Sequence, residues 1–160
     1  MKKSTFLYLL LTAAVGFWLW QRYFGDETAQ IRRQLAVIEE LVEKSAGEGA
    51  LDGVGRARSF AELFAEPFSA EVGPAGQTVG DRQQLMQLFV VFRHNSETVS
   101  LDYRRVDIAV AENRREAVAS FEALLNGGPG GILADHAYAV ELRFRKLSGE
   151  WKISQASVTE

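Results

Sequence analysis

Apolar residues follow a helical spacing in the first half of the chain and a strand spacing in the second half. Residues 26–45 are predicted to form a helix, because apolar side chains recur there at every third or fourth position. A glycine-rich stretch, residues 47–58, is expected to be a loop or loosely helical. A Ser-x-x-Glu capping box then opens a short helix over residues 59–66. Residues 81–94 form the third predicted helix, capped by Asp81 and carrying an apolar stripe.

Beyond residue 95 the apolar positions alternate, as expected for strands with one buried face. The strands predicted in this way cover residues 98–110, 117–125, 134–146 and 151–158. The apolar parity reverses at Arg104-Arg105, which predicts a β-bulge. Turns are expected at residues 112–114 and 148–150, and a wide glycine-rich loop at 126–131. With a short extended segment within residues 68–79, the pattern predicts an α+β fold, in which a curved antiparallel sheet wraps on three helices as a cone with an apolar pocket.

The first 25 residues have a pattern of their own. Lys2 and Lys3 precede an uncharged apolar run that ends in an aromatic cluster of Trp18, Trp20, Tyr23 and Phe24. As a helix, residues 5–24 would span about 30 Å, the thickness of a bilayer's hydrocarbon core, and Trp and Tyr favour its interface. We therefore expect an N-terminal transmembrane helix in residues 1–25 and one domain in residues 26–160.

A cleaved signal peptide is the alternative for this segment. The basic start and the length of the run fit one, but the small residues lie inside the run and its end is bulky, which disfavours cleavage. Lys2 and Lys3 favour a cytoplasmic N-terminus. The expected location is therefore a bacterial inner membrane, crossed once, with the C-terminal domain in the periplasm or otherwise outside the cytoplasm. The absence of cysteine is compatible with this compartment.

Charge narrows the possible partners. The predicted domain carries fifteen basic and twenty-one acidic residues, and its arginine pairs are interleaved with acids. A nucleic-acid-binding protein needs a concentrated positive face, so we exclude that class. About 135 residues suffice for one core without disulfides or metals.

The order of these elements resembles the nuclear transport factor 2-like superfamily, also called cystatin-like α+β cones. The resemblance covers residues 30–160 and includes residues 60–68 before a short strand, Gly80-Asp81-Arg82 at the third helix, and the closing residues 149–153. It implies the cone fold. Members include isomerases, dehydratases, polyketide cyclases, ligand binders and assembly domains, so the resemblance does not select a function.

Candidate chemistry lies on the apolar face of the predicted strands. His136 and Tyr138 share this face, Tyr103 can join them, and together they could polarise a carbonyl or move a proton. The ligand pocket predicted around these catalytic candidates is lined by Leu101, Tyr103, His136, Tyr138 and Trp151. The alternative is that His136 lies half-exposed at the cone mouth and that the tyrosines belong to the core.

Other motifs carry less chemistry. Asp102 and Glu122 have the opposite parity from the apolar residues, so they are expected to be solvated or paired with arginines. His94 suits the negative end of the third helix. With no cysteine and two distant histidines, no metal site is expected, and no cofactor is expected because the glycine-rich loop lacks the Lys-Ser or Lys-Thr of a phosphate loop.

Two functions follow from these expectations. The first, which we favour, is a membrane-tethered non-enzymatic domain that binds a partner protein, including a membrane protein, or a small apolar ligand. Its architecture is similar to that of inner-membrane assembly subunits of type IV secretion systems and of mammalian-cell-entry-associated membrane proteins. The second is a small isomerase, hydratase or cyclase acting on an apolar substrate in the cone. A homodimer through the outer sheet face is possible in either case, and that face would be lined by Glu122, Glu141, Arg143 and Arg145.

Overall fold

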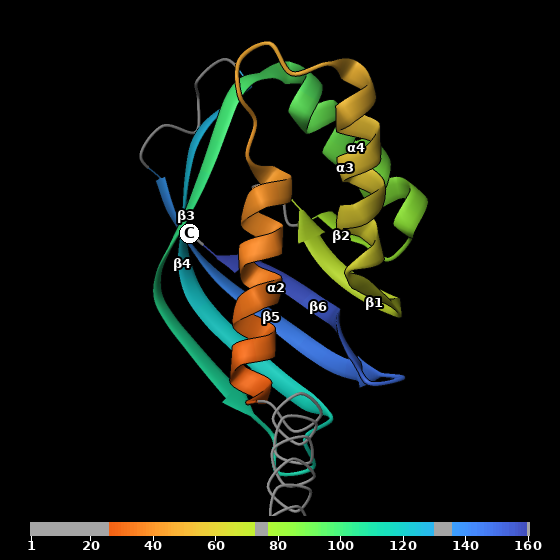
Figure 1. Ribbon diagram of the computed structural model, residues 1–160, viewed down its shortest axis with the longest axis vertical. Coiled ribbons are helices and arrows are strands. Elements are labelled where there is room, and N and C mark those ends of the chain that lie inside the picture. Colours follow the sequence, from red (N-terminus) through yellow and green to blue (C-terminus); the bar gives the residue numbers. More distant parts are fainter. Residues whose placement is uncertain (1–25, 73–76, 130–135, 160) are drawn as a thin grey trace, which may run out of the picture.

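Six strands form one curved sheet with the order β2-β1-β6-β5-β4-β3 (Figure 1). The computed structural model describes residues 26–72, 77–129 and 136–159. In chain order its elements are α2 (Glu27–Val42), α3 (Ala50–Glu62), β1 (Phe64–Val72), β2 (Gln77–Val79), α4 (Arg82–Asn95), β3 (Ser96–Val110), β4 (Glu116–Pro129), β5 (His136–Leu147) and β6 (Glu150–Thr159). The predicted α+β fold with three helices is therefore confirmed for the described residues.

Helix α2 lies across the strands, while α3 and α4 lie beside each other near β1 and β2 (Figure 1). Ile31, Leu35 and Ile38 are buried at spacings of three and four residues, which places one face of α2 against the sheet. The Asp26 carboxylate caps this helix by accepting the Thr28 N–H at 3.1 Å. Its bounds lie within the predicted range.

Helix α4 also begins where it was predicted. The Asp81 carboxylate accepts the Gln84 N–H at 2.8 Å, so Asp81 is the N-cap. Leu85 and Phe89 are buried, and the Phe89 ring stacks on Phe60 of α3 with 4.5 Å between centroids. This stacking joins the two helices into one layer.

The prediction for α3 was wrong at both ends. The helix starts at Ala50, within the stretch expected to be a loop or loosely helical, and Ser59 lies inside the helix rather than at its start. Gly53 and Gly55 disfavour helix locally, but Ala57 and Ala61 are buried in the folded protein. Tertiary packing therefore outweighs their local preference.

The predicted end of that helix at Pro67 was also wrong. The helix ends at Glu62, and Pro67 lies within β1. Strand β1 pairs in parallel with β6 and antiparallel with β2. The sheet is therefore mixed rather than purely antiparallel, with β3 to β6 forming the expected antiparallel meander.

The strand pattern was predicted in detail. The register between β3 and β4 shifts between Arg104 and Asp107, where a bulge was expected, and Arg105 has a φ of 53°. Ser148 and Gly149 form the expected tight turn between β5 and β6.

The glycine-rich segment was only partly a loop. Strand β4 runs on through Pro129, so residues 126–129 of the predicted loop are extended. At Gly127 an added Cβ would lie 2.0 Å from the Thr98 carbonyl oxygen. Glycine is therefore required here because β3 approaches so closely. Residues 130 and 131 of the predicted loop lie outside the described residues.

The core fills the space between the helices and the sheet. Its largest fully buried apolar side chains are Trp151, Phe144, Ile31, Ile153 and Val79. Phe60, Phe64 and Phe68 pack in series, with 5.5 and 5.0 Å between successive ring centroids. Aromatic and aliphatic side chains thus occupy the described interior of the cone.

The N-terminal membrane segment predicted in residues 1–25 lies outside the described residues. Within the described ranges, no helix combines the length and apolarity needed to cross a membrane.

Candidate functional site

The residues predicted to line a cone pocket can be placed by the register of their strands. Tyr103 and Tyr138 both pair with Ala123, a buried residue, so the two tyrosines share the inner face. Leu101 and His136 share the next row in the same way. For His136 only the backbone belongs to the described part of the protein. The register of β3, β4 and β5 therefore agrees with the face that the sequence pattern assigned to Tyr103 and Tyr138.

The Tyr103 hydroxyl is engaged with the backbone of α2. It donates to the Leu35 carbonyl oxygen at 3.1 Å, and its ring meets Phe121 edge-on with 4.9 Å between centroids. Burial, and secondarily the Glu39 carboxylate, raises the pKa of Tyr103 well above its usual value. This phenol therefore stays protonated and serves as a core hydrogen-bond donor.

Trp151 belongs to a polar cluster at the start of α2, which we call the base cluster: Glu27, Lys146 and Trp151. The indole N–H donates to a Glu27 oxygen at 2.8 Å, and Lys146 donates to the two Glu27 oxygens at 2.7 and 2.8 Å. The Lys146 ammonium also lies 5.3 Å from the centre of the Trp151 ring.

The base cluster stabilises the charged form of Glu27. Burial alone would raise the pKa of Glu27, but the hydrogen bonds from Lys146 and Trp151 and the positive charge of Lys146 outweigh it, so the pKa is lowered. The Trp151 side chain, buried and hydrogen-bonded, therefore fixes the start of α2.

The structure does not gather all five predicted residues around one cavity. Trp151 pairs with Lys146, eight residues along β5 from Tyr138, about 26 Å at roughly 3.3 Å per residue. Two cavities in the described part of the chain, which are described below, are lined by none of the five.

The acidic residues of opposite parity lie away from the core. Asp102 is exposed, and Glu122 forms an ion pair with the exposed Arg105, whose guanidinium donates to the Glu122 carboxylate at 2.6 Å. On the same outer face, Glu141 and Arg143 pair at 2.9 Å. Asp102 and Glu122 were expected to be solvated or paired with arginines, and the structure shows Asp102 exposed and Glu122 paired with Arg105.

A second polar cluster, at the other end of α2, was not predicted. Arg93 of α4 is only 3 % exposed and donates to the carbonyl oxygens of Leu41, Val42 and Glu43 at 2.8, 2.8 and 3.0 Å. It also pairs with Glu48 at 2.5 Å. A buried guanidinium here satisfies carbonyls that the helix end leaves without partners.

Glu48 extends this cluster toward the surface. Its Oε1 atom lies 3.3 Å from Arg56 Nε, and Arg56 also donates to the Glu40 carbonyl oxygen at 2.5 Å. We call Arg93, Glu48 and Arg56 the corner cluster. A sequence signal for it existed, because Arg93 follows Leu85 and Phe89 at four-residue spacing and so interrupts an apolar stripe with a charge.

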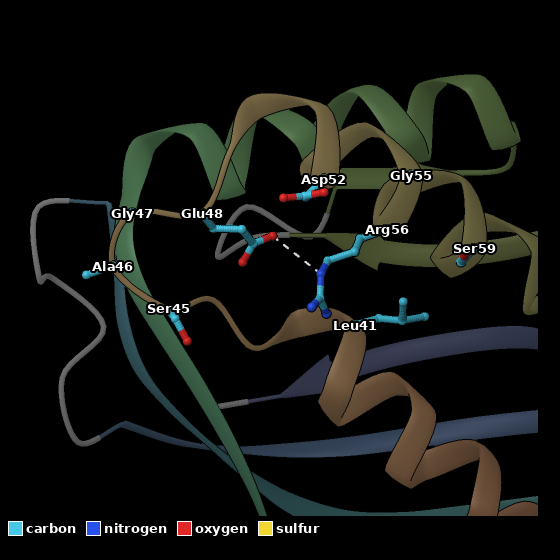
Figure 2. Close-up of a pocket in the computed structure, with 9 residues that line it drawn as sticks. All are labelled: Leu41, Ser45, Ala46, Gly47, Glu48, Asp52, Gly55, Arg56 and Ser59. Atoms are coloured by element: carbon cyan, nitrogen blue, oxygen red, sulfur yellow. Dashed lines mark ion pairs between the residues drawn. The ribbon is translucent and has the colours of Figure 1, made fainter.

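A cavity of about 660 Å³, the corner cavity, opens beside this cluster (Figure 2). The end of α2, the α2–α3 loop and one face of α3 contribute its walls. Its lining residues are Leu41, Ser45, Ala46, Gly47, Glu48, Asp52, Gly55, Arg56 and Ser59. In Figure 2 the side chains of Glu48 and Arg56 point toward each other.

A second cavity of about 480 Å³ lies where the α2–α3 loop meets the edge strand β3. The Lys44 backbone pairs with Val99 at 2.9 and 3.0 Å, and its ammonium donates to the carbonyl oxygens of Arg93 and Ser96 at 2.7 and 2.6 Å. These contacts hold the loop in place between the two cavities, which share Ser45 and Ala46.

His94 lies exposed in the last turn of α4, as its position suggested. The described residues contain no group of three or more His, Cys, Asp or Glu side chains arranged to hold a metal ion.

Comparison with known proteins yields no matching family model and no matching curated protein. Solved structures do match in fold. An NTF2-like protein with a cystatin-like fold from Novosphingobium aromaticivorans is 16% identical, with a TM-score of 0.63 over 93% of this chain and 88% of that chain. The fold is NTF2-like.

Other structures with this fold differ in the activity attributed to them. A proposed dehydratase of the NTF2-like family from Streptomyces avermitilis is 14% identical, with a TM-score of 0.63 over 82% of this chain and 94% of that chain. A proposed aromatic ring hydroxylase from Novosphingobium aromaticivorans is 13% identical, with a TM-score of 0.60 over 81% and 85%. Identities this low support the fold and no specific function.

Proposed function

We propose that this protein is a membrane-tethered, non-enzymatic domain that binds a partner protein outside the cytoplasm. The observation that carries the proposal is that two of the polar side chains considered for catalysis or for the pocket, Tyr103 and Trp151, are engaged in hydrogen bonds that hold the fold together. Tyr103 is hydrogen-bonded to Leu35 and Trp151 to Glu27. General acid–base catalysis requires a free group within reach of a substrate proton.

The enzymatic alternative is an isomerase, hydratase or cyclase. Two proteins of similar fold are described as a dehydratase and a ring hydroxylase, and for this reason an enzymatic function is the second candidate. It requires a carboxylate beside His136 inside the cone. The described acids Glu122 and Glu141 instead pair with arginines on the outer face.

The tether is proposed for residues 5–24, before α2. Helix α2 has sixteen residues and therefore spans about 24 Å. The corner cavity is lined by Leu41, at the far end of this helix (Figure 2). A membrane before α2 would thus leave the cavity directed away from the bilayer, which favours a protein partner over a lipid. In a bacterium the domain would lie in the periplasm.

A homodimer through the outer sheet face remains part of the proposal. Arg105–Glu122 and Glu141–Arg143 pair within one chain and display both signs of charge there. Such a face is compatible with a second copy that presents the same charges.

The test is site-specific photo-crosslinking of the full-length protein in its native membrane. A photoreactive residue at Ala46, which lines both cavities, is expected to capture one discrete protein. The same residue at Glu112 of the β3–β4 hairpin, which neither cavity touches, serves as the control. A stoichiometric small molecule bound to the purified protein, with no captured protein, would overturn the proposal in favour of the alternatives.

The tether has its own measurement. Intact-mass spectrometry of the purified protein is expected to find residues 1–25 retained. Their loss would show a cleaved signal peptide and reject the anchor.

A further inference from the structure

Helix α2 has one side that packs on the sheet and one side that is left uncovered. Ile31, Leu35 and Ile38 are buried against the sheet. In Figure 1 the helix crosses in front of the sheet, and no described helix or strand is drawn over it. The side chains on this opposite side are exposed or half-buried, and we call them the α2 outer face: Ala29, Arg32, Arg33, Ala36, Val37 and Glu40.

Charge is divided along the α2 outer face. Arg32 and Arg33 lie in its first half, and Glu40 lies in its second half beside Glu39 and Glu43. Within the described part of the chain none of these five side chains forms an ion pair, and Arg33 Nε only donates to the Ala29 carbonyl oxygen of its own helix, at 3.4 Å. The helix therefore presents a positive half followed by a negative half.

The charges around this face, in contrast, are used within the fold. Asp26 caps α2, and Glu27 belongs to the base cluster. The Lys44 ammonium donates to two carbonyl oxygens, and Arg56 pairs with Glu48. The arginines and glutamates of the α2 outer face are thus the charges that remain for another molecule.

The α2 outer face is complementary to an antiparallel copy of itself. Arg33 and Glu40 are equally far from the midpoint between Ala36 and Val37. A two-fold axis through this midpoint therefore places Arg33 of each copy opposite Glu40 of the other, so the contact is made twice. A parallel copy would instead place Arg33 against Arg33, and like charges facing each other are unfavourable.

The residues at the midpoint suit a contact between two helices. Ala36 is small and allows the backbones to approach, and Val37 is 42 % exposed, so its apolar surface becomes covered. Exposed ion pairs contribute little affinity but fix orientation and register.

We infer that the α2 outer face binds the same face of a second copy of this chain, with the two helices antiparallel. This surface is separate from the outer sheet face, on which Glu141 and Arg143 pair within one chain. The inference goes beyond the proposed function, because it concerns contact between copies and not the captured partner.

The pairing adds a condition to the membrane arrangement. Antiparallel helices begin at opposite ends of the pair, so two copies tethered in one bilayer can pair in this way only with α2 along the bilayer surface. The corner cavity of each copy then lies about 24 Å, the length of α2, from its own tether. A tether also raises the effective concentration of the copies, which favours a weak contact.

The experiment uses single cysteines in the full-length protein, in its native membrane and after purification. The chain has no cysteine of its own, so an introduced thiol is the only one. Ala36→Cys lies close to the two-fold axis and is expected to give a disulfide-linked dimer under a mild oxidant. Ala29→Cys is expected to give none, because antiparallel pairing separates its two copies by about 22 Å along the helices.

Charge reversal in the Ala36→Cys protein tests the ion pairs. Arg33→Glu and Glu40→Arg alone are each expected to lower the yield of linked dimer about tenfold, and the double variant to restore it. Arg58→Glu, which reverses an exposed charge on α3, is the matched control and should leave the yield unchanged. Recovery in the double variant shows that loss of folding does not cause the single effects.

Three results would overturn the inference. Linked dimer from Ala29→Cys in the same yield as from Ala36→Cys would show parallel helices. A double variant that stays as low as the single variants would show that Arg33 and Glu40 do not meet. Linked dimer only from Ser120→Cys, which lies opposite Glu141 on the outer sheet face, would show that copies meet there instead. In each case the photo-crosslinking at Ala46 still tests the proposed function separately.

Discussion

Helix α2 is fixed by charged side chains at both ends, but the two ends use charge differently. At its start, Glu27 accepts hydrogen bonds from Lys146 and Trp151. At its end, Arg93 donates to three carbonyl oxygens and pairs with Glu48. In each case the charge complements the helix macrodipole, with the acid at the positive end and the base at the negative end.

The difference lies in what remains after these contacts. In the base cluster Glu27 accepts hydrogen bonds from both Lys146 and Trp151, and neither of the two cavities described above is lined by these residues. In the corner cluster two arginines share one Glu48 oxygen, and the neighbouring Asp52 carboxylate stays unpaired within the described part of the chain. Similar chemistry therefore forms a closed cluster at one end of the helix and a cluster beside an open cavity at the other end.

The largest effect should come from removing the centre of the corner cluster. Arg93→Met leaves the α2 carbonyls and Glu48 without their buried donor, so the free energy of unfolding is expected to fall by about 3 kcal/mol or more. Urea unfolding followed by circular dichroism measures it. Arg93→Lys, which keeps the charge but cannot reach all four acceptors, should lose less. A loss below about 1 kcal/mol for Arg93→Met would contradict the central role of this side chain.

A smaller effect is expected at the base cluster. Glu27→Gln removes the ion pair with Lys146 but keeps the shape, and should lower the free energy of unfolding by about 1–2 kcal/mol at pH 7. Because the folded pKa of Glu27 is lowered from its usual value of 4.5, its contribution is fully present above that pH and is lost as the pH falls through the folded pKa.

The measurement for the base cluster is therefore a pH series. The stability gap between wild type and Glu27→Gln, taken from urea midpoints, should shrink as the pH is lowered below about 4.5. A gap that stays constant down to pH 2 would show that the carboxylate charge is not what stabilises this end.

The smallest effect concerns the wall of the corner cavity. Gly53→Ala and Gly55→Ala should each raise the free energy of unfolding by about 0.5–1 kcal/mol, because alanine favours helix and its Cβ meets open space at both positions. Thermal unfolding of the two variants measures this. Gly127→Ala is the opposite control and should destabilise, since its Cβ would overlap the Thr98 carbonyl oxygen. A loss of stability in both α3 variants would argue against a helix there.

Helices α2 and α4 and the meander from β3 to β6 could be predicted because their signals, helix caps and the spacing of apolar residues, involve residues close together in the sequence. The Asp81 cap is an example, because it acts on an N–H three residues away. The alternation around Tyr103 and Tyr138 gave their common face, since a strand's side chains alternate whatever it pairs with. The bulge at Arg104-Arg105 followed from a change of parity alone.

Helix α3 and the candidate site could not be predicted in this way. Two glycines and a capping-box motif pointed to a later start for α3, and only contacts such as Phe60 on Phe89 reverse that preference. The corner cluster joins Arg93 to Glu48, forty-five residues earlier, and to the end of α2. The spacing of residues in the sequence does not show that Arg93 contacts Glu48 and the end of α2.

The sequence by itself determined the class of fold, the alternation of the strands in the meander and the cap of α4, because these depend on neighbours a few residues apart. Only the tertiary structure decided that the described cone interior is packed, that β1 joins the sheet beside β6, and that a cavity opens at the end of α2. These outcomes depend on how buried volume is filled and how distant donors and acceptors are matched, which is settled when the helices pack on the sheet.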